Sequence, residues 1–270
     1  MTSRRSVAII GVGAMGEALA SGLLSAGWGP GELSLCVRRM ERADELSHRT
    51  GCRVVLDPLE AIDSRDVVVV AVKPRDVDGL LKTLAGHVTE DQMVVTLAAG
   101  VTTATYQKHL GAVPVIRAMP NTPALVREGV TGVAPGEHAS VAHLDAAKEV
   151  LGAVGAVRAM DEPLLDAVTA VSGTGPAYVF LLAEALTEAA MREGLPRDVA
   201  ESFVHQTIRG AGHLLTDTSK SPAELRYEVT SPGGTTAAAI HVLEEKGFRA
   251  VVEDAVRAAA IRAQELGGGG

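Results

Sequence analysis

Aromatic side chains are scarce in this chain, since Phe, Trp and Tyr together make up 3% of its 270 residues. A buried core therefore has to be built from aliphatic residues, which dominate a hydrophobic content of 47%. A basic balance is also missing, because the formal net charge is -8. That charge argues against a nucleic-acid-binding face, which would be basic. It does not exclude a small anionic ligand, because one helix N-terminus can bind an anion whatever the total charge.

Cysteine is equally sparse. Cys36 and Cys52 are too few for a disulfide framework and have no zinc-ligand spacing. Neither an H-E-x-x-H motif nor a Cys/His cluster is present, so no metal site is predicted. The N-terminal stretch MTSRRSVAIIGVGAMG breaks at glycines too early for a signal peptide or a membrane span. These absences favour a soluble cytoplasmic protein without a membrane partner, whose closing GGGG run frays.

Short apolar runs alternate with helical patterns in the first part of the chain. The predicted strands cover Val7–Ile10, Leu33–Val37, Val67–Val72, Met93–Ala98 and Val113–Ala118, and the predicted helices cover Met15–Ala26, Glu41–Thr50, Asp76–Leu84 and Thr102–Leu110. Strands that alternate with helices indicate βαβ units with right-handed crossovers. The pattern predicts an α/β fold, with a doubly wound parallel sheet of the Rossmann type.

The pattern changes from about Asp161 onward, where no strand is predicted. The predicted helices cover Leu164–Val171, Ala177–Glu193, Arg197–Leu215, Thr235–Glu245 and Phe248–Leu266. Their alanine-rich faces favour close helix packing, including packing between subunits. We therefore expect a cofactor-binding domain over residues 1–160 and an all-helical domain over residues 161–270.

The segment VAIIGVGAMGEALASGLL places Gly11, Gly13 and Gly16 in G-x-G-x-x-G register, directly after a strand and before a helix. This order indicates a dinucleotide site: the first glycine makes the turn, the second admits the pyrophosphate, and the third allows close helix packing. The pyrophosphate is expected on the N–H groups of Ala14 and Met15. The alternative is a structural glycine turn without a ligand.

The end of the second strand bears on which nucleotide is bound. An NAD site usually carries an acidic residue there, whereas this chain has Arg38 and Arg39 in the stretch LCVRRMER. Two guanidinium groups suit a 2′-phosphate, which they can pair with bidentately. We predict a preference for NADPH, with NADH as a second donor. Two solvated surface arginines are the alternative.

Further strand ends should lie beside the cofactor, because ligands of such sheets bind beyond the carboxyl ends of strands. The stretch VVVVAVKP contributes Ala71, Val72, Lys73 and Pro74, and the stretch LAAG contributes Leu97–Gly100. Lys73 is interpreted as a solvated strand-end lysine rather than a catalytic one.

Three more stretches stand out together: RAMPNTPA at Arg117–Ala124, SGTGPAYVFLLAEAL at Ser172–Leu186 and LRYEVTSPGGTTAAAI at Leu225–Ile240. Together with the N-terminal glycines they resemble the Δ1-pyrroline-5-carboxylate reductases, from about Val7 to Leu266. The resemblance implies an oxidoreductase that reduces the cyclic imine 1-pyrroline-5-carboxylate to L-proline with NAD(P)H, the last step of proline biosynthesis. It also implies a homodimer, assembled into a decamer in several members, with the active site between the cofactor domain and the helical domains.

The resemblance assigns the substrate to the SPGGTT segment. Ser231 and the N–H groups of Gly233, Gly234, Thr235 and Thr236 would receive the carboxylate, and the Thr236 hydroxyl, the catalytic group, would sit beside the ring nitrogen. Glycines suit this purpose, because side chains on a first helical turn would obstruct N–H donors. We expect Pro232 in that first turn, where proline is tolerated. The alternative is an ordinary helix start capped by Ser231.

The resemblance also places Glu162 near the substrate, Val12 among the backbone contacts to the cofactor, and Ala99 on the nicotinamide side. One departure concerns the adenosine ribose, which an asparagine contacts in many relatives. Asp57 and Pro58 stand nearest that position here, and a proline cannot make the contact.

Two other functions remain open on the residues alone. One is a different NADP-dependent imine or β-hydroxy-acid oxidoreductase, which would want a lysine base on the long second-domain helix, whereas Tyr178–Glu193 contains no lysine. The other is a module that senses NADP without turnover.

Overall fold

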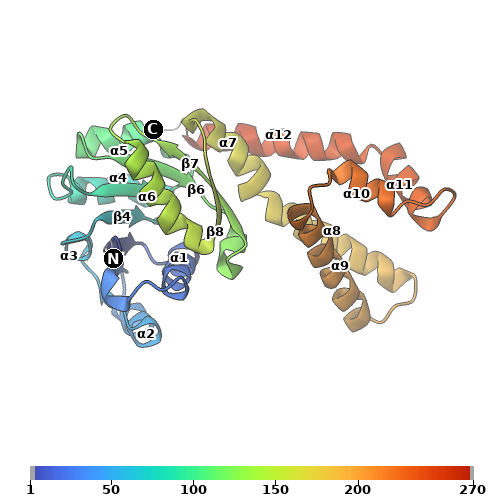
Figure 1. The fold of residues 1–270 in the computed structure, drawn as a ribbon, viewed down its shortest axis with the longest axis horizontal. Helices are drawn as coiled ribbons and strands as arrows, with labels where there is room; N and C mark the ends of the chain where they lie inside the picture. The colour runs from blue at the N-terminus through green and yellow to red at the C-terminus, as the bar shows by residue number, and fades with distance from the viewer. Residues whose placement is uncertain (1–3, 268–270) are drawn as a thin grey trace. The chain divides into compact units, whose positions relative to one another are not determined.

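A computed structural model describes residues 4–267 of the chain, so the last three glycines of the predicted frayed tail lie outside the described residues. Its N-terminal part is built on an eight-stranded sheet in the order β3-β2-β1-β4-β5-β6-β7-β8 (Figure 1). The strands are β1 (Val7–Ile10), β2 (Leu33–Cys36), β3 (Arg53–Val55), β4 (Val67–Val70), β5 (Met93–Thr96), β6 (Val115–Met119), β7 (Gly129–Pro135) and β8 (Gly155–Ala159). The order reverses between β1 and β4, which confirms the doubly wound sheet.

The first six strands run parallel, which agrees with the predicted parallel sheet, although β3 itself was not predicted. β7 departs from the prediction because it pairs antiparallel with β6, and β8 then pairs parallel with β7. The helices of this part are α1 (Ala14–Ser25), α2 (Met40–Thr50), α3 (Pro58–Ile62), α4 (Pro74–Leu84), α5 (Thr103–Leu110), α6 (Val141–Leu151) and α7 (Leu165–Val168). Shorter helical turns are η1 (Pro30–Glu32), η2 (Thr122–Val126), η3 (Gly152–Val154), η4 (Glu162–Leu164) and η5 (Thr169–Gly173).

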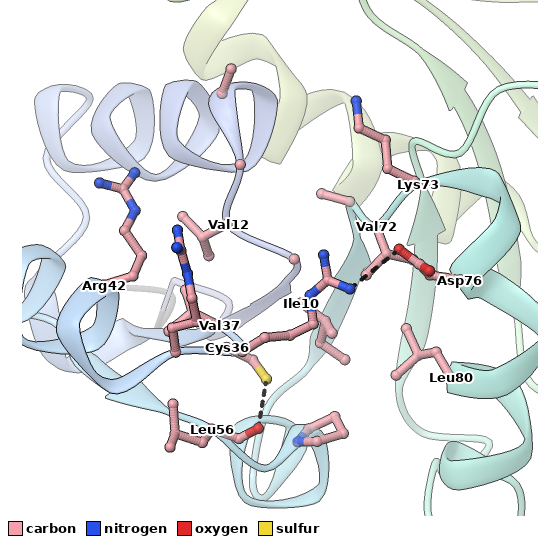
Figure 2. A pocket seen from close by; sticks show the side chains of 17 residues that line it. Ile10, Val12, Cys36, Val37, Arg42, Leu56, Val72, Lys73, Asp76 and Leu80 are labelled. Carbon is pink, nitrogen blue, oxygen red and sulfur yellow. Dashed lines mark hydrogen bonds and ion pairs between the residues drawn. The ribbon is translucent and has the colours of Figure 1, made fainter.

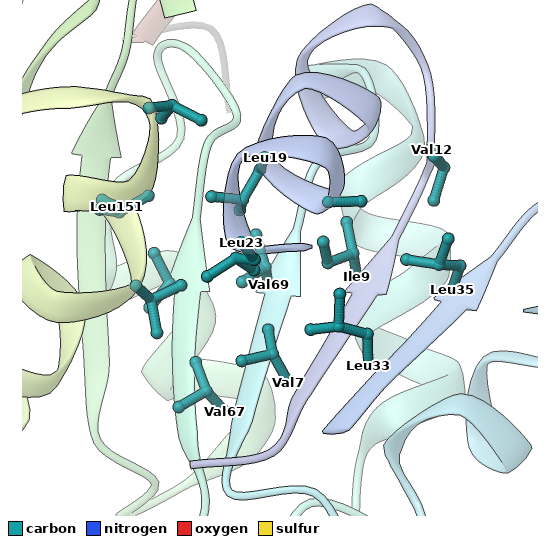
Figure 3. Packing of buried hydrophobic residues seen from close by; sticks show 14 of the residues in the cluster. Val7, Ile9, Val12, Leu19, Leu23, Leu33, Leu35, Val67, Val69 and Leu151 are labelled. Carbon is teal, nitrogen blue, oxygen red and sulfur yellow. The ribbon is translucent and has the colours of Figure 1, made fainter. Parts of the chain in front are cut away.

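Successive residues of each inner strand enter two different cores. On β1, Val7 and Ile9 pack with α1, α2 and α6, as Figure 3 shows for Leu19 and Leu23 of α1. Ala8 and Ile10 face the other way, into a cluster formed with α3, α4 and α5. Because side chains alternate across a strand, a strand covered on both faces has to be apolar throughout. The β-branched runs of the sequence meet this requirement.

The remaining helices are α8 (Gly175–Arg192), α9 (Arg197–Asp217), α10 (Pro222–Glu228), α11 (Thr235–Glu245) and α12 (Phe248–Gly267). No strand follows β8 among the described residues, which agrees with the predicted helical second part. The chain forms two compact units, one of residues up to Thr174 and from Ala259 onward, the other of Gly175–Ala258. The functional division at residue 160 stays a prediction.

Several elements escaped the sequence analysis, namely β3, β7, β8, α3, α6 and α10. β3 has only three residues, none of them buried, and β7 contains two glycines and a proline. Short, exposed or glycine-rich segments carry little periodicity, so their type is hard to infer. The predicted helix at Leu164–Val171 is a series of short turns, η4, α7 and η5.

By length and composition alone, Glu162–Arg192 is apolar enough to cross a membrane, with a mean hydropathy of 1.3 over its best window. This is weak evidence for a span, because core and interface helices of other proteins pass the same test. The segment also contains the turns η4 and η5.

The packing against the sheet can be tested with two valines of α6. Val150 is 0% exposed and Val141 is 76% exposed. Val150→Ala should lower the free energy of unfolding by about 2 kcal/mol, because it leaves a cavity between α6 and the sheet. The control Val141→Ala should change it by less than about 0.5 kcal/mol. Urea unfolding at one fixed protein concentration measures both, and equal effects would contradict the described packing.

Candidate functional site

A cleft of about 480 Å³ lies at the carboxyl ends of β1, β2 and β4 (Figure 2). Nine residues predicted for the cofactor line it: Gly11, Val12, Gly13, Ala14, Arg38, Arg39, Ala71, Val72 and Lys73. The strand order reverses at this point, which is where ligands of doubly wound sheets bind. Its size lies in the usual range for small-molecule sites.

The three fingerprint glycines have three different surroundings. Gly11 has a φ of 91°, and a Cβ there would lie 2.7 Å from Val72 Cγ1. A Cβ on Gly16 would lie 3.0 Å from the Gly11 carbonyl oxygen. A Cβ on Gly13 would meet nothing within 4 Å, so its backbone faces open space. The turn, the close packing and the open approach are what a bound pyrophosphate requires.

The start of α1 is open to an anion. Its N-cap is Gly13, which has no side chain to accept from the first N–H groups of the helix. Those of Ala14 and Met15 have no acceptor within the helix, because the first intrahelical bond is donated by Glu17 to the Gly13 carbonyl, at 2.9 Å. Open N–H groups and the positive end of the helix dipole together favour a phosphate.

Three arginines line the cleft at the end of β2. Arg38 has an 85% exposed side chain, and its Nη1 lies 3.7 Å from Asp76 Oδ2. Arg42, which the sequence analysis missed, forms an ion pair with Glu17. No local pattern indicated it, because Arg39 is the extended N-cap of α2 and does not share a helix face with Arg42.

Apolar residues of the lining were also missed. They are Leu56, Pro58 and Leu80, together with Cys36. Figure 2 shows Leu56 near Cys36, and Leu80 on the opposite side of the cleft. Burial, with a smaller effect of the Asp57 charge, raises the pKa of the Cys36 thiol to about 11. The thiol therefore stays neutral at pH 7 and acts as an apolar contact.

Asp57 and Pro58 have different surroundings. Asp57 caps α3, since its Oδ1 accepts from Leu59 N–H at 2.9 Å. Pro58 lines the cleft, whereas Asp57 does not. Four predicted residues lie outside the lining: Met15 and Gly16 within α1, Pro74 as the first residue of α4, and Ala99 after β5.

The SPGG segment forms a turn in front of α11. Gly234 N–H donates to the Ser231 carbonyl at 3.0 Å, and Gly233 has a φ of 66°. Pro232 followed by a glycine of positive φ is the pattern of a type II turn. The placement of Pro232 in the first helical turn is therefore wrong, because α11 begins at Thr235 and its N-cap is Gly234, not Ser231.

The turn leaves the start of α11 open. A Cβ on Gly234 would collide with Ser231 Oγ, so a side chain there would require the Ser231 side chain to move. No side chain caps the helix, and by helix geometry the N–H groups of Thr235 and Thr236 have no acceptor within it. Thr236 is half-buried, and Thr235 is exposed. The arrangement offers N–H donors to an anion, much as α1 does.

Glu162 holds a different part of the structure together. Its Oε1 accepts from Thr103 N–H at 2.8 Å and its Oε2 from the Thr103 hydroxyl at 2.7 Å, at the start of α5. Arg117, whose side chain is 7% exposed, lies 3.4 Å from Glu162 and 3.1 Å from Asp166. Both oxygens of Glu162 thus have partners within the fold. The group fixes the start of α5, shortly after the Leu97–Gly100 segment.

No group of three or more His, Cys, Asp or Glu side chains is arranged to hold a metal ion within residues 4–267.

Known proteins resemble this chain over almost all of its length. A family model described as pyrroline-5-carboxylate reductase dimerisation matches residues 162–266, and one described as NADP oxidoreductase coenzyme F420-dependent matches residues 6–100. The pyrroline-5-carboxylate reductase of Corynebacterium melassecola is 41% identical over 266 residues, covering 97% of this chain and 98% of the relative.

Solved structures of proteins with similar names also resemble this chain. A pyrroline-5-carboxylate reductase from Coxiella burnetii has a TM-score of 0.94 at 37% identity, covering 98% of this chain and 99% of that one. The pyrroline carboxylate reductase of Plasmodium falciparum, solved with NADP bound, has a TM-score of 0.86 at 26% identity, covering 97% of this chain and 98% of that one.

Arg117 provides a test of the Glu162 group. Arg117→Leu should lower the free energy of unfolding by about 3 kcal/mol, because it leaves two partly buried carboxylates without their counter-ion. Adding Glu162→Gln and Asp166→Asn should recover much of that loss. Arg158→Leu, an exposed arginine of β8, serves as the control and should have little effect. A triple variant no more stable than Arg117→Leu alone would refute the charge pairing.

Proposed function

This chain belongs to the pyrroline-5-carboxylate reductase family, and from that membership we propose that it reduces 1-pyrroline-5-carboxylate to L-proline with NADPH. The reaction is the last step of proline biosynthesis, and the protein is an oxidoreductase. The observation that carries the proposal is a similarity to reductases of that name that covers 97% of the chain, the cleft and the α11 segment included.

The cleft residues suit NADPH. Gly11, Gly13 and Ala14 would hold the pyrophosphate at the start of α1, and Arg38 with Arg39 would hold the 2′-phosphate. Val12 and Met15 belong to the same backbone surface, with Gly16 packing behind it. NADH, which has no 2′-phosphate, would be the weaker donor. When bound, NADPH supplies the hydride.

On the nicotinamide side we assign the ends of β4 and β5. Ala71, Val72, Lys73 and Pro74 come from the first, and Ala99 from the second. Ala71 and Ala99 are half-buried, and small side chains leave room for a ring. Glu162 would act near the substrate by fixing the start of α5, since both of its oxygens already accept hydrogen bonds.

The substrate carboxylate is assigned to the start of α11. The N–H groups of Gly233, Thr235 and Thr236 would donate to it, with Ser231 alongside. Gly234, also assigned to the substrate, contributes mainly by its missing side chain, because its own N–H already donates to Ser231. An anion at this helix end gains from both the open donors and the dipole.

The reaction requires the chain to orient the substrate and does not require a strong acid. A protonated imine is already electrophilic. A hydride would form a new C–H bond at the carbon of the C=N bond, and the π electron pair of that bond would become the nitrogen lone pair. The N–H of the protonated imine would donate to the Thr236 hydroxyl, which would fix the orientation of the substrate ring. Such positioning is a large part of what an enzyme adds to cofactor chemistry.

We assign the functional form to a homodimer, with a decamer as its higher assembly. Gly175–Ala258 leaves large apolar side chains exposed, among them Phe180, Leu181 and Phe203, at 61–68%. Apolar surface of this kind is typical of a protein interface, and the match to a dimerisation model supports a second copy of this chain as partner. Light scattering in solution measures both assemblies.

A cytoplasmic location fits the same proposal. Cys36 and Cys52 are both free and buried, which suits a reducing compartment. Fractionation of cells that express the full chain tests the location, and recovery in the membrane fraction would overturn it.

The activity itself is tested by NADPH absorbance. We expect a decrease that depends on added 1-pyrroline-5-carboxylate, with formation of one L-proline for each NADPH oxidised. NADPH binding without substrate-dependent oxidation would instead indicate a sensing module. NADPH oxidation only with the keto form of a β-hydroxy acid would indicate a different reductase.

Thr236 provides the test of the substrate site. Thr236→Val removes the hydroxyl at almost constant volume and should lower kcat about ten- to a hundredfold, the value of one hydrogen bond to a charged group. Thr236→Ser should restore most of the activity, and the Kd for NADPH should change in neither variant. A normal kcat for Thr236→Val would exclude the hydroxyl from the reaction.

A further inference from the structure

A carboxylate stands opposite an arginine across the mouth of the cofactor cleft. Asp76 lies in the first turn of α4, and its Oδ2 is 3.7 Å from Arg38 Nη1, as the dashed line at Asp76 shows in Figure 2. Arg38 follows β2 and Asp76 follows β4, and β1 lies between those strands in the sheet. The pair therefore crosses the cleft above the end of β1.

The other arginines of the cleft are in different situations. Arg42 is held by Glu17 and by Glu45, the latter at 2.7 Å. Arg39 has no ion-pair partner among the described residues. Arg38 alone of the three pairs with a carboxylate that itself lines the cleft. Its side chain is largely exposed and the distance exceeds that of a hydrogen bond, so the pair is weak and can be displaced.

We propose that Asp76 sets the preference between NADPH and NADH by competing with the 2′-phosphate for Arg38. The inference rests on the proposed use of NADPH. A 2′-phosphate that takes the Arg38 guanidinium has to break the pair and brings more negative charge near Asp76. NADH has a hydroxyl instead of the phosphate and leaves the pair in place. Because specificity is a difference of two affinities, a carboxylate that opposes only one cofactor changes the ratio.

Asp76 also has an ordinary structural use, from which its proposed role can be separated. A carboxylate in the first turn of a helix interacts favourably with the helix dipole. The backbone N–H of Asp76 donates to the Lys73 carbonyl at 2.9 Å, which belongs to the same helix start. A purely structural Asp76 would affect stability and would affect the binding of both cofactors alike.

Direct binding to the full-length protein tests the proposal, by calorimetry with NADPH and with NADH. Asp76→Asn should lower the Kd for NADPH about fivefold, at the upper end of what an exposed ion pair contributes, and should leave the Kd for NADH nearly unchanged. Asp78→Asn is the matched control: Asp78 lies on the same helix, pairs with Lys82 and His109, and is not part of the cleft lining. It should change neither Kd.

A second background tests whether Asp76 acts through Arg38. In Arg38→Gln protein, Asp76→Asn should improve NADPH binding far less, because the competition for Arg38 has been removed and only the repulsion between Asp76 and the 2′-phosphate remains. The full fivefold effect in that background would overturn the proposal, as would an unchanged NADPH affinity or an equal change for both cofactors. Wild-type protein that fails to bind NADPH would overturn the proposed function as well, so the two failures are distinguishable.

Discussion

Both proposed sites depend on helices whose first N–H groups are left uncapped. Four other helices have a side-chain cap, namely Asp57 on α3, Thr102 on α5, Ser140 on α6 and Ser221 on α10. The helices α2, α4 and α9 also lack such a cap, although Arg39, Lys73 and Pro196 stand at their N-cap positions. The helices α1 and α11 instead follow a glycine, which has no side chain to offer. A glycine at the N-cap costs only about a few tenths of a kcal/mol relative to a good side-chain cap. A bound anion would add hydrogen bonds and a favourable interaction with the helix dipole at either of these two starts.

The packing of the N-terminal sheet holds the start of α1 in place. Two apolar clusters hold β1 between β2 and β4, so the turn at Gly11 opens where the strand order reverses. The charges are then distributed around that opening. Arg42 is tied to α1 through Glu17, whereas Arg38 remains loosely paired and available. Farther along the sheet, Glu162 holds the start of α5 through part-buried hydrogen bonds and is itself paired with Arg117, and so it shapes the backbone after β5.

Much of this was predictable because the decisive residues are local in sequence. The glycine fingerprint, the β-branched strands and four helices of the second part, α8, α9, α11 and α12, follow from spacing alone. The start of α11 at Thr235 was predicted to the residue. The turn before it was misjudged, because proline suits both a helix start and a type II turn. Asp76, Leu80 and Arg42 were missed since their roles arise from elements brought together by the sheet. The contacts of Glu162 with Thr103 and Arg117 link residues more than forty positions apart, and no local pattern reveals them.

The central claim is that a carboxylate is bound by the uncapped start of α11. A crystal structure of the protein with L-proline tests it most directly. We expect a carboxylate oxygen of proline within about 3 Å of the backbone nitrogens of Thr235 and Thr236, the usual N–H···O distance. Proline bound with its carboxylate on lysine or arginine side chains, and those backbone nitrogens facing solvent, would contradict the account.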